Sequence, residues 1–290
     1  MTLFELKQKY QKRADLSEID LLISFAIKKP QEYILSYPEF RLTKKQEEKI
    51  KKLIEKRIKG EPLAYLIGKK EFFNIDFFVN KNVLIPRPET EMIVEEILNE
   101  LGNIKEKTAL TDIGTGSGNI IISLSKNLKQ KNIKFLASDV SKNTLSLARK
   151  NTKIYKQNKK IKFFLSNLLD NKNLIKEFKY IENLIIAANL PYLPEKYLKQ
   201  KETKLTAGLK YEPKTALVGG KNGLDFYKKL TLQILKLKEE FPKIKIISFY
   251  EINSEQKDLF EKWKKKKNIK IRTSYKKDLN KRWRVCKLKF

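Results

Sequence analysis

The sequence predicts an α/β protein whose mostly parallel, doubly wound sheet has an antiparallel edge and is preceded by a small all-helical domain. Three observations lead to this fold class. Residues 3–59 carry apolar positions at helical spacing and no strand-like alternation. From residue 109 onward, apolar runs typical of buried strands alternate with amphipathic segments, as in a parallel sheet covered by helices. Two final runs, near 269–274 and 283–290, are expected to pair antiparallel at one edge.

The composition excludes several kinds of chemistry. With 290 residues, the chain is long enough for two domains and for a core that needs no disulfides. The single cysteine, Cys286, excludes an internal disulfide, and the absence of histidine removes His-dependent catalysis and almost every standard zinc site, so we expect no metal. Residues 1–30 show no secretory pattern, and no apolar stretch of about 18 residues could span a bilayer. We therefore expect a soluble, cytoplasmic protein with no membrane partner.

The formal charge of +30 raises the question of a nucleic-acid partner. The basic residues are nearly all lysine, beside abundant Asn and Ile, which is typical of a genome biased toward A and T. They are also scattered over almost every amphipathic segment. We therefore favour a solvated surface over a dedicated nucleic-acid groove, although the charge would still steer an acidic partner, such as a ribonucleoprotein or an acidic protein, toward the chain.

Helix signals divide the N-terminal region, residues 1–60. One helix is expected to begin at Asp15 and Ser17 and to bury one apolar face, formed by Leu16, Ile19, Leu22, Ile23 and Ala26. A second is bounded by Pro30 and Pro38. Thr43 is expected to cap a third, with Glu47 completing an approximate capping box, and this helix runs to Gly60.

Residues 61–84 are predicted to be a hairpin linker, and residues 85–290 a catalytic domain. Apolar residues of the linker alternate around Asn74: Phe72, Phe73, Ile75, Phe77 and Val79. A helix should begin near Glu89 and run to Leu101. The expected strands that follow are 109–113, 133–137, 161–165, 184–188 and 244–249, and the expected helices are 118–129, 142–153, about 223–239 and one from Ser254.

A glycine turn, Gly114–Gly118, connects the first of these strands to a helix. Glycine permits a tight turn and a close backbone approach to a ligand, and the helix N-terminus offers free N–H groups. Asp139 ends the next strand, where a carboxylate can accept hydrogen bonds from ribose hydroxyls. Because the spacing is tighter than Gly-x-Gly-x-x-Gly, a nucleotide-like cofactor without phosphate fits better than a dinucleotide. The alternative is a plain strand–helix turn with a surface Asp.

The segment Asn189-Leu190-Pro191-Tyr192 follows another strand rich in Ile and Ala. The Asn189 side-chain oxygen and the Leu190 carbonyl could bind two hydrogens of an amide and direct its nitrogen toward a methyl donor. Tyr192 could form a flat wall and Pro191 would stiffen the loop. These features indicate methyl transfer to a nitrogen of low nucleophilicity. An ordinary exit loop with buried aromatic packing is the alternative.

These motifs, taken with others upstream and downstream, resemble one family along the whole chain. Asn-Leu-Pro-Tyr is similar to the Asn-Pro-Pro-Tyr signature of amino-methyltransferases. The segments Gly60–Gly68, Glu71-Phe72 and Leu84–Glu91 resemble the bacterial release factor glutamine methyltransferases, the HemK/PrmC family, as do Glu212-Pro213, Ala216-Leu217, Gly219-Gly220 and Gly223-Leu224. The string Ile-Pro-Arg-Pro-Glu-Thr-Glu at 85–91 is highly specific.

The resemblance implies a class I methyltransferase fold with a seven-stranded, Rossmann-like sheet, and an N-terminal domain that recognises the substrate. It implies methyl transfer from S-adenosylmethionine, with S-adenosylhomocysteine as product, to the side-chain amide nitrogen (N5) of the glutamine in the Gly-Gly-Gln loop of release factors. A monomer is expected. The implied cofactor residues are Asp112, Gly114, Thr115, Gly116, Ser117, Gly118, Asp139, Asn167, Leu168 and Asn189. The implied substrate residues are Arg87, Pro88, Glu89, Asn189, Leu190, Pro191 and Tyr192, of which the last four are also the implied catalytic residues.

This chain departs from the family pattern at two places. Leu190 replaces the first proline of the signature, so the loop loses one φ constraint. Asn167 and Leu168 stand where many relatives have an acidic and an aromatic residue, so the adenine would be held by apolar cover more than by stacking. Two rival hypotheses are an adenine-N6 methyltransferase acting on DNA or RNA, and a non-enzymatic RNA- or ribosome-binding protein on a decayed methyltransferase scaffold.

Overall fold

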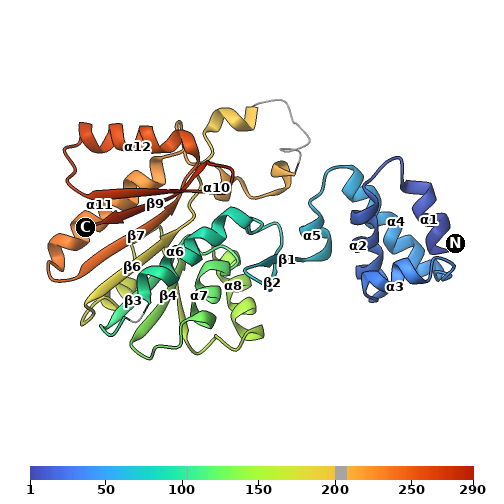
Figure 1. Ribbon diagram of the computed structural model, residues 1–290, viewed down its shortest axis with the longest axis horizontal. Coiled ribbons are helices and arrows are strands. Elements are labelled where there is room, and N and C mark those ends of the chain that lie inside the picture. The colour runs from blue at the N-terminus through green and yellow to red at the C-terminus, as the bar shows by residue number, and fades with distance from the viewer. Residues whose placement is uncertain (103, 200–207) are drawn as a thin grey trace. The chain divides into compact units, whose positions relative to one another are not determined.

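The computed structural model describes residues 1–102, 104–199 and 208–290, which form two compact units (Figure 1). The first unit consists of Met1–Lys69 together with residues 208–211, and the second of residues 70–199 and 212–290. Within these described ranges, no helix combines the length and the apolar character that crossing a membrane requires.

The first unit is helical. Its helices are α1 (Leu3–Tyr10), α2 (Leu16–Ile27), α3 (Gln31–Ser36), α4 (Lys44–Ile58) and α5 (Leu63–Ile67), and a short 3-10 turn, η3 (Leu209–Tyr211), belongs to the same unit. Apolar side chains from all five helices form one core, in which Leu3, Leu22, Ile34, Ile50 and Leu66 take part. Two bidentate ion pairs lie on its surface: Arg13, in the turn after α1, pairs with Glu55 of α4, and Arg57 of α4 pairs with Glu18 of α2.

The N-terminus of α4 corrects one detail expected from the sequence. Thr43 is the N-cap, but Gln46, and not Glu47, completes the capping box. Gln46 stands three positions after the cap, and its side chain accepts a hydrogen bond from the Thr43 backbone N–H at 3.0 Å. Glu47 is one position too far along the helix and instead pairs with Lys51 and the N-terminal amine.

A two-stranded hairpin consists of β1 (Lys69–Phe72) and β2 (Ile75–Phe78). Phe73 and Asn74 between them both have positive φ, 50° and 59°, as a type I′ turn requires. This is the hairpin that the alternation around Asn74 predicts. Phe72 and Phe77 are buried and pack edge to face.

The second unit is built on a seven-stranded sheet with the order β5-β4-β3-β6-β7-β9-β8. The strands are β3 (Thr108–Ile113), β4 (Ile133–Asp139), β5 (Ile161–Leu165), β6 (Asn183–Ala188), β7 (Lys245–Glu251), β8 (Arg272–Lys277) and β9 (Trp283–Lys289). β3 to β7 pair in parallel, and β9 is antiparallel to both β7 and β8. The mostly parallel sheet with an antiparallel edge is therefore confirmed.

Helices cover both faces of this sheet (Figure 1). They are η1 (Pro88–Thr90), α6 (Glu91–Leu101), α7 (Asn119–Asn127), α8 (Lys142–Ile154), α9 (Lys172–Lys176), η2 (Glu195–Lys199), α10 (Lys214–Leu217), α11 (Asp225–Glu240) and α12 (Ser254–Lys266). Side chains alternate along each buried strand: Leu110 and Ile185 pack with α6 and α7, whereas Ala109 and Ile186 pack with α9, α11 and α12. Cys286 of β9 is buried in the second of these cores.

The strand order places two loops side by side. From β3 the chain proceeds outward to β4 and β5 and then returns to β6 on the other side of β3. Ile113, the last residue of β3, pairs with Ala188, the last residue of β6. The order in which strands are added to the sheet therefore changes direction between β3 and β6, and open α/β sheets bind ligands at such a point. The glycine turn emerges there beside Asn189.

Candidate active site

A cavity of about 680 Å³ lies at the carboxyl ends of the parallel strands. Four strand-to-helix loops contribute to its wall, those after β3, β4, β5 and β6. The predicted residues in the wall are Gly114, Thr115, Gly116, Ser117, Asp139, Asn167, Leu168, Asn189, Leu190 and Pro191. The structure thus brings both predicted motifs to one cavity, of the size typical for a small-molecule site.

The glycine turn needs its glycines. Gly114, Gly116 and Gly118 have φ of 73°, 56° and 82°, in the left-handed region that side chains disfavour. A Cβ on Gly114 would also lie 2.9 Å from the Leu190 side chain, so the two motifs are in direct contact. Gly118 is the N-cap of α7 and does not line the cavity.

Asp112 lies behind the turn and not in the cavity wall. Its side chain is fully buried and accepts a hydrogen bond from the Thr115 hydroxyl at 2.7 Å. Burial raises the pKa of this carboxyl to about 7, although the Thr115 hydrogen bond counteracts part of the rise. Its position is that of a support for the turn.

Asp139 joins the ends of two strands at the cavity. One carboxylate oxygen accepts from the Gly116 N–H at 3.2 Å, and the other accepts from the Ser141 N–H at 2.9 Å. Burial raises the pKa of the Asp139 carboxyl despite these hydrogen bonds. The next residue, Val140, is 67% exposed and lines the cavity, an apolar surface that the sequence did not single out.

Leu168 has an unusual backbone. Its φ of 57° is rare for a residue with a branched side chain, and the Ser166 hydroxyl donates to its carbonyl at 2.8 Å. The side chain is only 6% exposed, and both Asn167 and Leu168 line the cavity. Strained conformations of this kind gather at ligand sites.

Only the nitrogen of the Asn189 carboxamide has a hydrogen-bond partner among the described residues. Its Nδ2 donates to the Thr90 hydroxyl at 2.9 Å, while Oδ1 is shielded from solvent and has no hydrogen-bond partner among the described residues. An unpaired buried acceptor is costly, by roughly 1–3 kcal/mol. A site that presents such an oxygen at a cavity wall is prepared to receive a donor.

The Leu190 peptide is bound by a tyrosine hydroxyl. Leu190 N–H donates to the Tyr227 oxygen at 3.2 Å, and the Leu190 carbonyl lies 3.3 Å from the same hydroxyl. Tyr227 makes its shorter contact with the Glu251 carbonyl, so its one hydrogen is directed there. The Leu190 carbonyl therefore keeps its capacity to accept.

Other predicted residues lie outside the cavity wall. The Tyr192 hydroxyl donates to Glu251 at 3.1 Å, and burial, reinforced by this carboxylate, raises the Tyr192 pKa. Arg87 pairs with the buried Glu212, and Glu89 pairs with Arg284 at 3.4 Å. Pro88 begins η1, also outside the wall.

Sequence reasoning assigned no site role to several residues that line the cavity. The wall is completed by residues 81–84, Pro86, Thr90, Asn119, Ile120, Ser141, Thr144, Ser166, residues 213–216, Val218 and Phe226. Within the motif at 85–91, Pro86 and Thr90 line the cavity, whereas the implied substrate residues Arg87, Pro88 and Glu89 do not. Glu251, which bonds Thr90 and Tyr192, could have been noticed as a carboxylate that directly follows the apolar run of β7.

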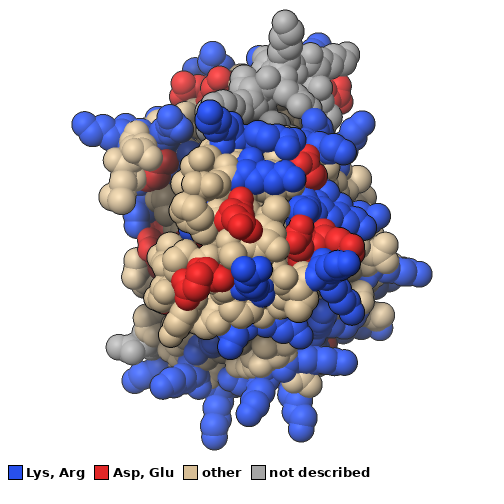
Figure 2. All heavy atoms as spheres, turned by 90° about the vertical axis from the view of Figure 1, so that its right-hand side faces the viewer, with Lys and Arg blue, Asp and Glu red and all other residues tan. Residues whose placement is uncertain are grey.

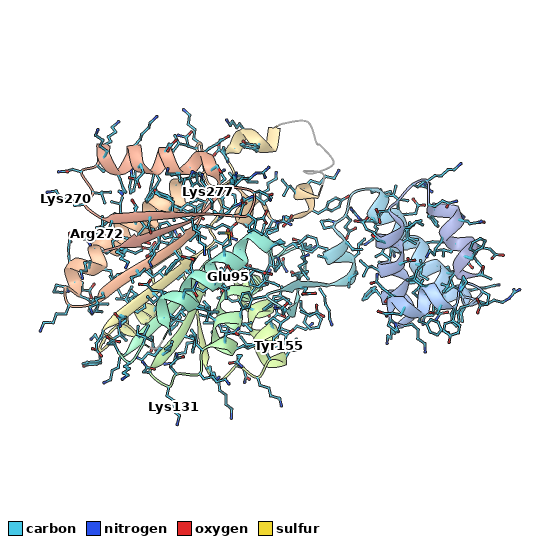
Figure 3. All side chains as sticks on the ribbon, in the orientation of Figure 1. Glu95, Lys131, Tyr155, Lys270, Arg272 and Lys277 are labelled. Carbon is cyan, nitrogen blue, oxygen red and sulfur yellow. The ribbon has the colours of Figure 1, made fainter. Side chains whose placement is uncertain are left out.

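Basic side chains are spread over the molecule. Figure 2 shows Lys and Arg around acidic and uncharged areas of the visible face, without a single basic stripe. In the second unit, Lys131, Lys270 and Lys277 are exposed and project in different directions (Figure 3). The visible face therefore carries basic, acidic and uncharged areas together.

Two family models match this chain. The PrmC N-terminal domain matches residues 3–68, and the N-6 DNA Methylase model matches residues 82–257. Curated relatives called release factor glutamine methyltransferase align over most of the chain. The protein from Dictyoglomus turgidum is 39% identical and covers 80% of this chain and 78% of its own. The protein from Coxiella burnetii is 34% identical, with coverages of 73% and 70%.

Solved structures share the fold at low identity. The hMettl16 catalytic domain in complex with MAT2A 3'UTR hairpin 1 gives a TM-score of 0.56 at 15% identity, covering 79% of this chain and 78% of that one. Human methyltransferase 10 domain containing protein gives 0.50 at 16%, with coverages of 74% and 88%. Together with the sheet order, these likenesses identify the class I methyltransferase fold.

Proposed function

The chain belongs to the release factor glutamine methyltransferases, and from this premise we propose that it methylates the side-chain amide nitrogen (N5) of the glutamine in the Gly-Gly-Gln loop of peptide chain release factors. The methyl donor is S-adenosylmethionine. The observation that carries the proposal is the unpaired Oδ1 of Asn189 at the cavity wall, beside the glycine turn.

The residues of the cavity fit S-adenosylmethionine. The turn with three positive-φ glycines lets a ligand approach the backbone closely, and Asp139 offers carboxylate oxygens to ribose hydroxyls. Val140 and Leu168 offer apolar cover for an adenine ring. When bound, the cofactor supplies an electrophilic methyl group on a sulfonium.

Asn189 and Leu190 would do the positioning. An amide nitrogen is a poor nucleophile because its lone pair is delocalised into the carbonyl. If Asn189 Oδ1 and the Leu190 carbonyl accept its two hydrogens, the nitrogen is fixed in place with its lone pair directed at the methyl carbon, and the two oxygens stabilise the positive charge that the nitrogen acquires as the N–C bond forms. One of these hydrogens then leaves as a proton, which restores a neutral amide. No strong base is needed, which agrees with a chain that contains no histidine.

Adenine-N6 methylation is the second candidate, because the N-6 DNA Methylase model also matches residues 82–257. An exocyclic amine presents the same two hydrogens to the same acceptors. The match of residues 3–68 to the PrmC N-terminal domain favours the protein substrate. The unpaired Asn189 oxygen and the glycine turn argue against a decayed, non-enzymatic scaffold.

A monomer and a cytoplasmic location remain part of the proposal. Gel filtration with light scattering would measure the mass of the enzyme in solution and test whether it is a monomer. A substrate that acts in translation supports the cytoplasm.

The test is a methylation assay with labelled S-adenosylmethionine. The protein is incubated in parallel with release factor, with release factor whose Gly-Gly-Gln glutamine is replaced by alanine, and with DNA and RNA. We expect label only on the unaltered release factor, located on that glutamine by mass spectrometry. Label on nucleic acid alone would replace the proposal by the adenine alternative.

A further inference from the structure

Two buried residues outside the Asn-Leu-Pro-Tyr tetrapeptide are hydrogen-bonded in series to its asparagine. Thr90, in η1, and Glu251, at the end of β7, are each 1% exposed. The Thr90 hydroxyl donates to Glu251 Oε2 at 2.5 Å and lies 2.9 Å from Asn189 Nδ2. The three side chains therefore form one hydrogen-bonded line that ends at the cavity.

The hydrogens in this line can be assigned. An ionised carboxylate only accepts, and a hydroxyl has one hydrogen to give. Thr90 gives it to Glu251, so its oxygen must accept, and the only group of Asn189 that can donate is Nδ2. The amide is thereby turned so that Oδ1 has no partner among the described residues.

We propose that Thr90 and Glu251 are positioning residues that orient the Asn189 carboxamide with its oxygen toward the incoming amide. This inference rests on the function proposed above. Turned by 180°, Asn189 would present N–H groups to the substrate N–H groups, and no hydrogen bond could form.

Glu251 also holds the other end of the tetrapeptide. Its second carboxylate oxygen accepts from the Tyr192 hydroxyl at 3.1 Å, and its backbone carbonyl accepts from Tyr227, which in turn bonds the Leu190 peptide. One residue of β7 thus fixes both acceptors proposed for the substrate. A buried polar network of this kind favours one arrangement of its side chains, and Asn189 Oδ1 is the member without a partner among the described residues.

The charge state of Glu251 decides whether the hydrogen bond between Thr90 and Asn189 can run in only one direction. Burial, with a smaller contribution from Glu89, raises its pKa to about 7, although hydrogen bonds from the Thr90 and Tyr192 hydroxyls and the charge of Arg284 oppose the rise; Tyr227 contacts its backbone. Below that pH the protonated carboxyl can donate its own hydrogen within the line. The hydroxyl beside it is then free to donate to the amide oxygen, and the turned-over amide becomes allowed. Turnover should therefore fall as the pH drops through about 7.

The test compares Thr90→Val, Thr90→Ser and a control, Thr111→Val. Valine keeps the shape of threonine without its hydroxyl, and serine restores the hydroxyl. Thr111 is equally buried, has an unpaired hydroxyl and lies outside the cavity wall. We expect Thr90→Val to lower kcat by roughly 10- to 100-fold, the range for loss of an outer-shell partner. KM for release factor and the Kd of the cofactor should stay within a few-fold, and Thr90→Ser should recover most of the loss.

The pH profile adds a second readout. In wild type, kcat should rise as the pH increases through about 7. In Thr90→Val this rise should disappear, because the hydroxyl that connects Glu251 to Asn189 is missing. Full activity of Thr90→Val would overturn the inference, as would a loss of cofactor binding equal to the loss of turnover. If wild type methylates no release factor, the proposed function fails and the inference fails with it, whereas an active wild type with an equally active Thr90→Val rejects the inference alone.

Discussion

Asn189 has one amide oxygen and one amide nitrogen, and the structure commits them to different tasks. The nitrogen donates a hydrogen bond to the Thr90 hydroxyl, and the oxygen has no hydrogen-bond partner among the described residues. Substituting this side chain should therefore lower activity even where the fold is unaffected.

Replacing Asn189 by alanine should therefore separate chemistry from cofactor binding. We expect kcat to fall roughly 10²-fold or more, as for loss of one oxyanion-hole group, while the Kd of S-adenosylmethionine changes little. Single-turnover kinetics and calorimetry measure the two quantities. Weakening of cofactor binding by the same factor would assign Asn189 to the cofactor instead.

Asp112 should make stability depend on pH. Its pKa is about 7 in the folded protein, above the ordinary value of 3.8, so between these values the native state binds more protons than the unfolded state. Stability from this group is full at low pH and is lost as the pH rises through about 7. Asp112→Asn should remove this slope, which is at most about 1.4 kcal/mol per pH unit.

Urea unfolding from pH 5 to 8 measures this effect, with the exposed Asp258→Asn as the matched control. The wild type minus Asp112→Asn difference should decline with pH, and the difference for the control should stay flat. Parallel curves for wild type and Asp112→Asn would mean that the buried carboxyl does not hold its proton.

Single residues of the site could be predicted from the sequence where they lie in a contiguous motif. The glycine turn and Asn189 stand directly after strands, so their positions follow from the strand assignment. Thr90 and Glu251 lie 161 positions apart and interact only because η1 and β7 converge. No local pattern could have shown that pair, or the direction of its hydrogen bonds.

Among the larger elements, the loop after β6 is supported by the segment 217–223. Leu193 and Val218 form a parallel bridge, and the Gln256 side chain donates to the carbonyls of Tyr192 and Gly223. These contacts restrain the loop after β6, in which Leu190 lacks the ring of a proline. It also explains the glycines of the downstream motif, which the sequence alone could not place.

Gly219→Ala should therefore damage the loop. A Cβ at this position would lie 2.3 Å from the Pro191 carbonyl oxygen and 2.9 Å from the Tyr192 Cα. Both are backbone atoms, so the loop itself must shift, at a cost of about 1–3 kcal/mol. Thermal unfolding and kcat should both decline.

Gly208→Ala is the matched control, since its Cβ would make only an ordinary contact with Pro62 at 3.5 Å. If both variants keep wild-type melting temperature and kcat, the supporting role of residues 217–223 is wrong.

For the molecule as a whole, the sequence predicted the alternation of strands and helices and the antiparallel edge, because buried strands and amphipathic helices have different periods. It assigned no site role to residues 81–84, residues 213–216 and Val218, which line the cavity. These segments have no regular period, and only the closed structure brings them to the site.

The net charge of +30 leads to a prediction about association. If it steers an acidic substrate, kcat/KM for release factor should fall as salt rises from about 0.1 to about 1 M, where the screening length shrinks from about 10 to about 3 Å. The Kd of the cofactor, measured in the same buffers, should change far less. If neither kcat/KM for release factor nor the Kd of the cofactor changes with salt, the net charge does not steer the substrate.

Cys286 has a practical consequence of a different kind. Burial raises the pKa of its thiol to about 12, so it stays protonated and unreactive toward maleimides at neutral pH. An engineered cysteine on an exposed lysine position would then be the sole labelling site of an otherwise native polypeptide. Fluorophores attached one at a time to either unit would let energy transfer to a labelled release factor report which part of the enzyme approaches its substrate first.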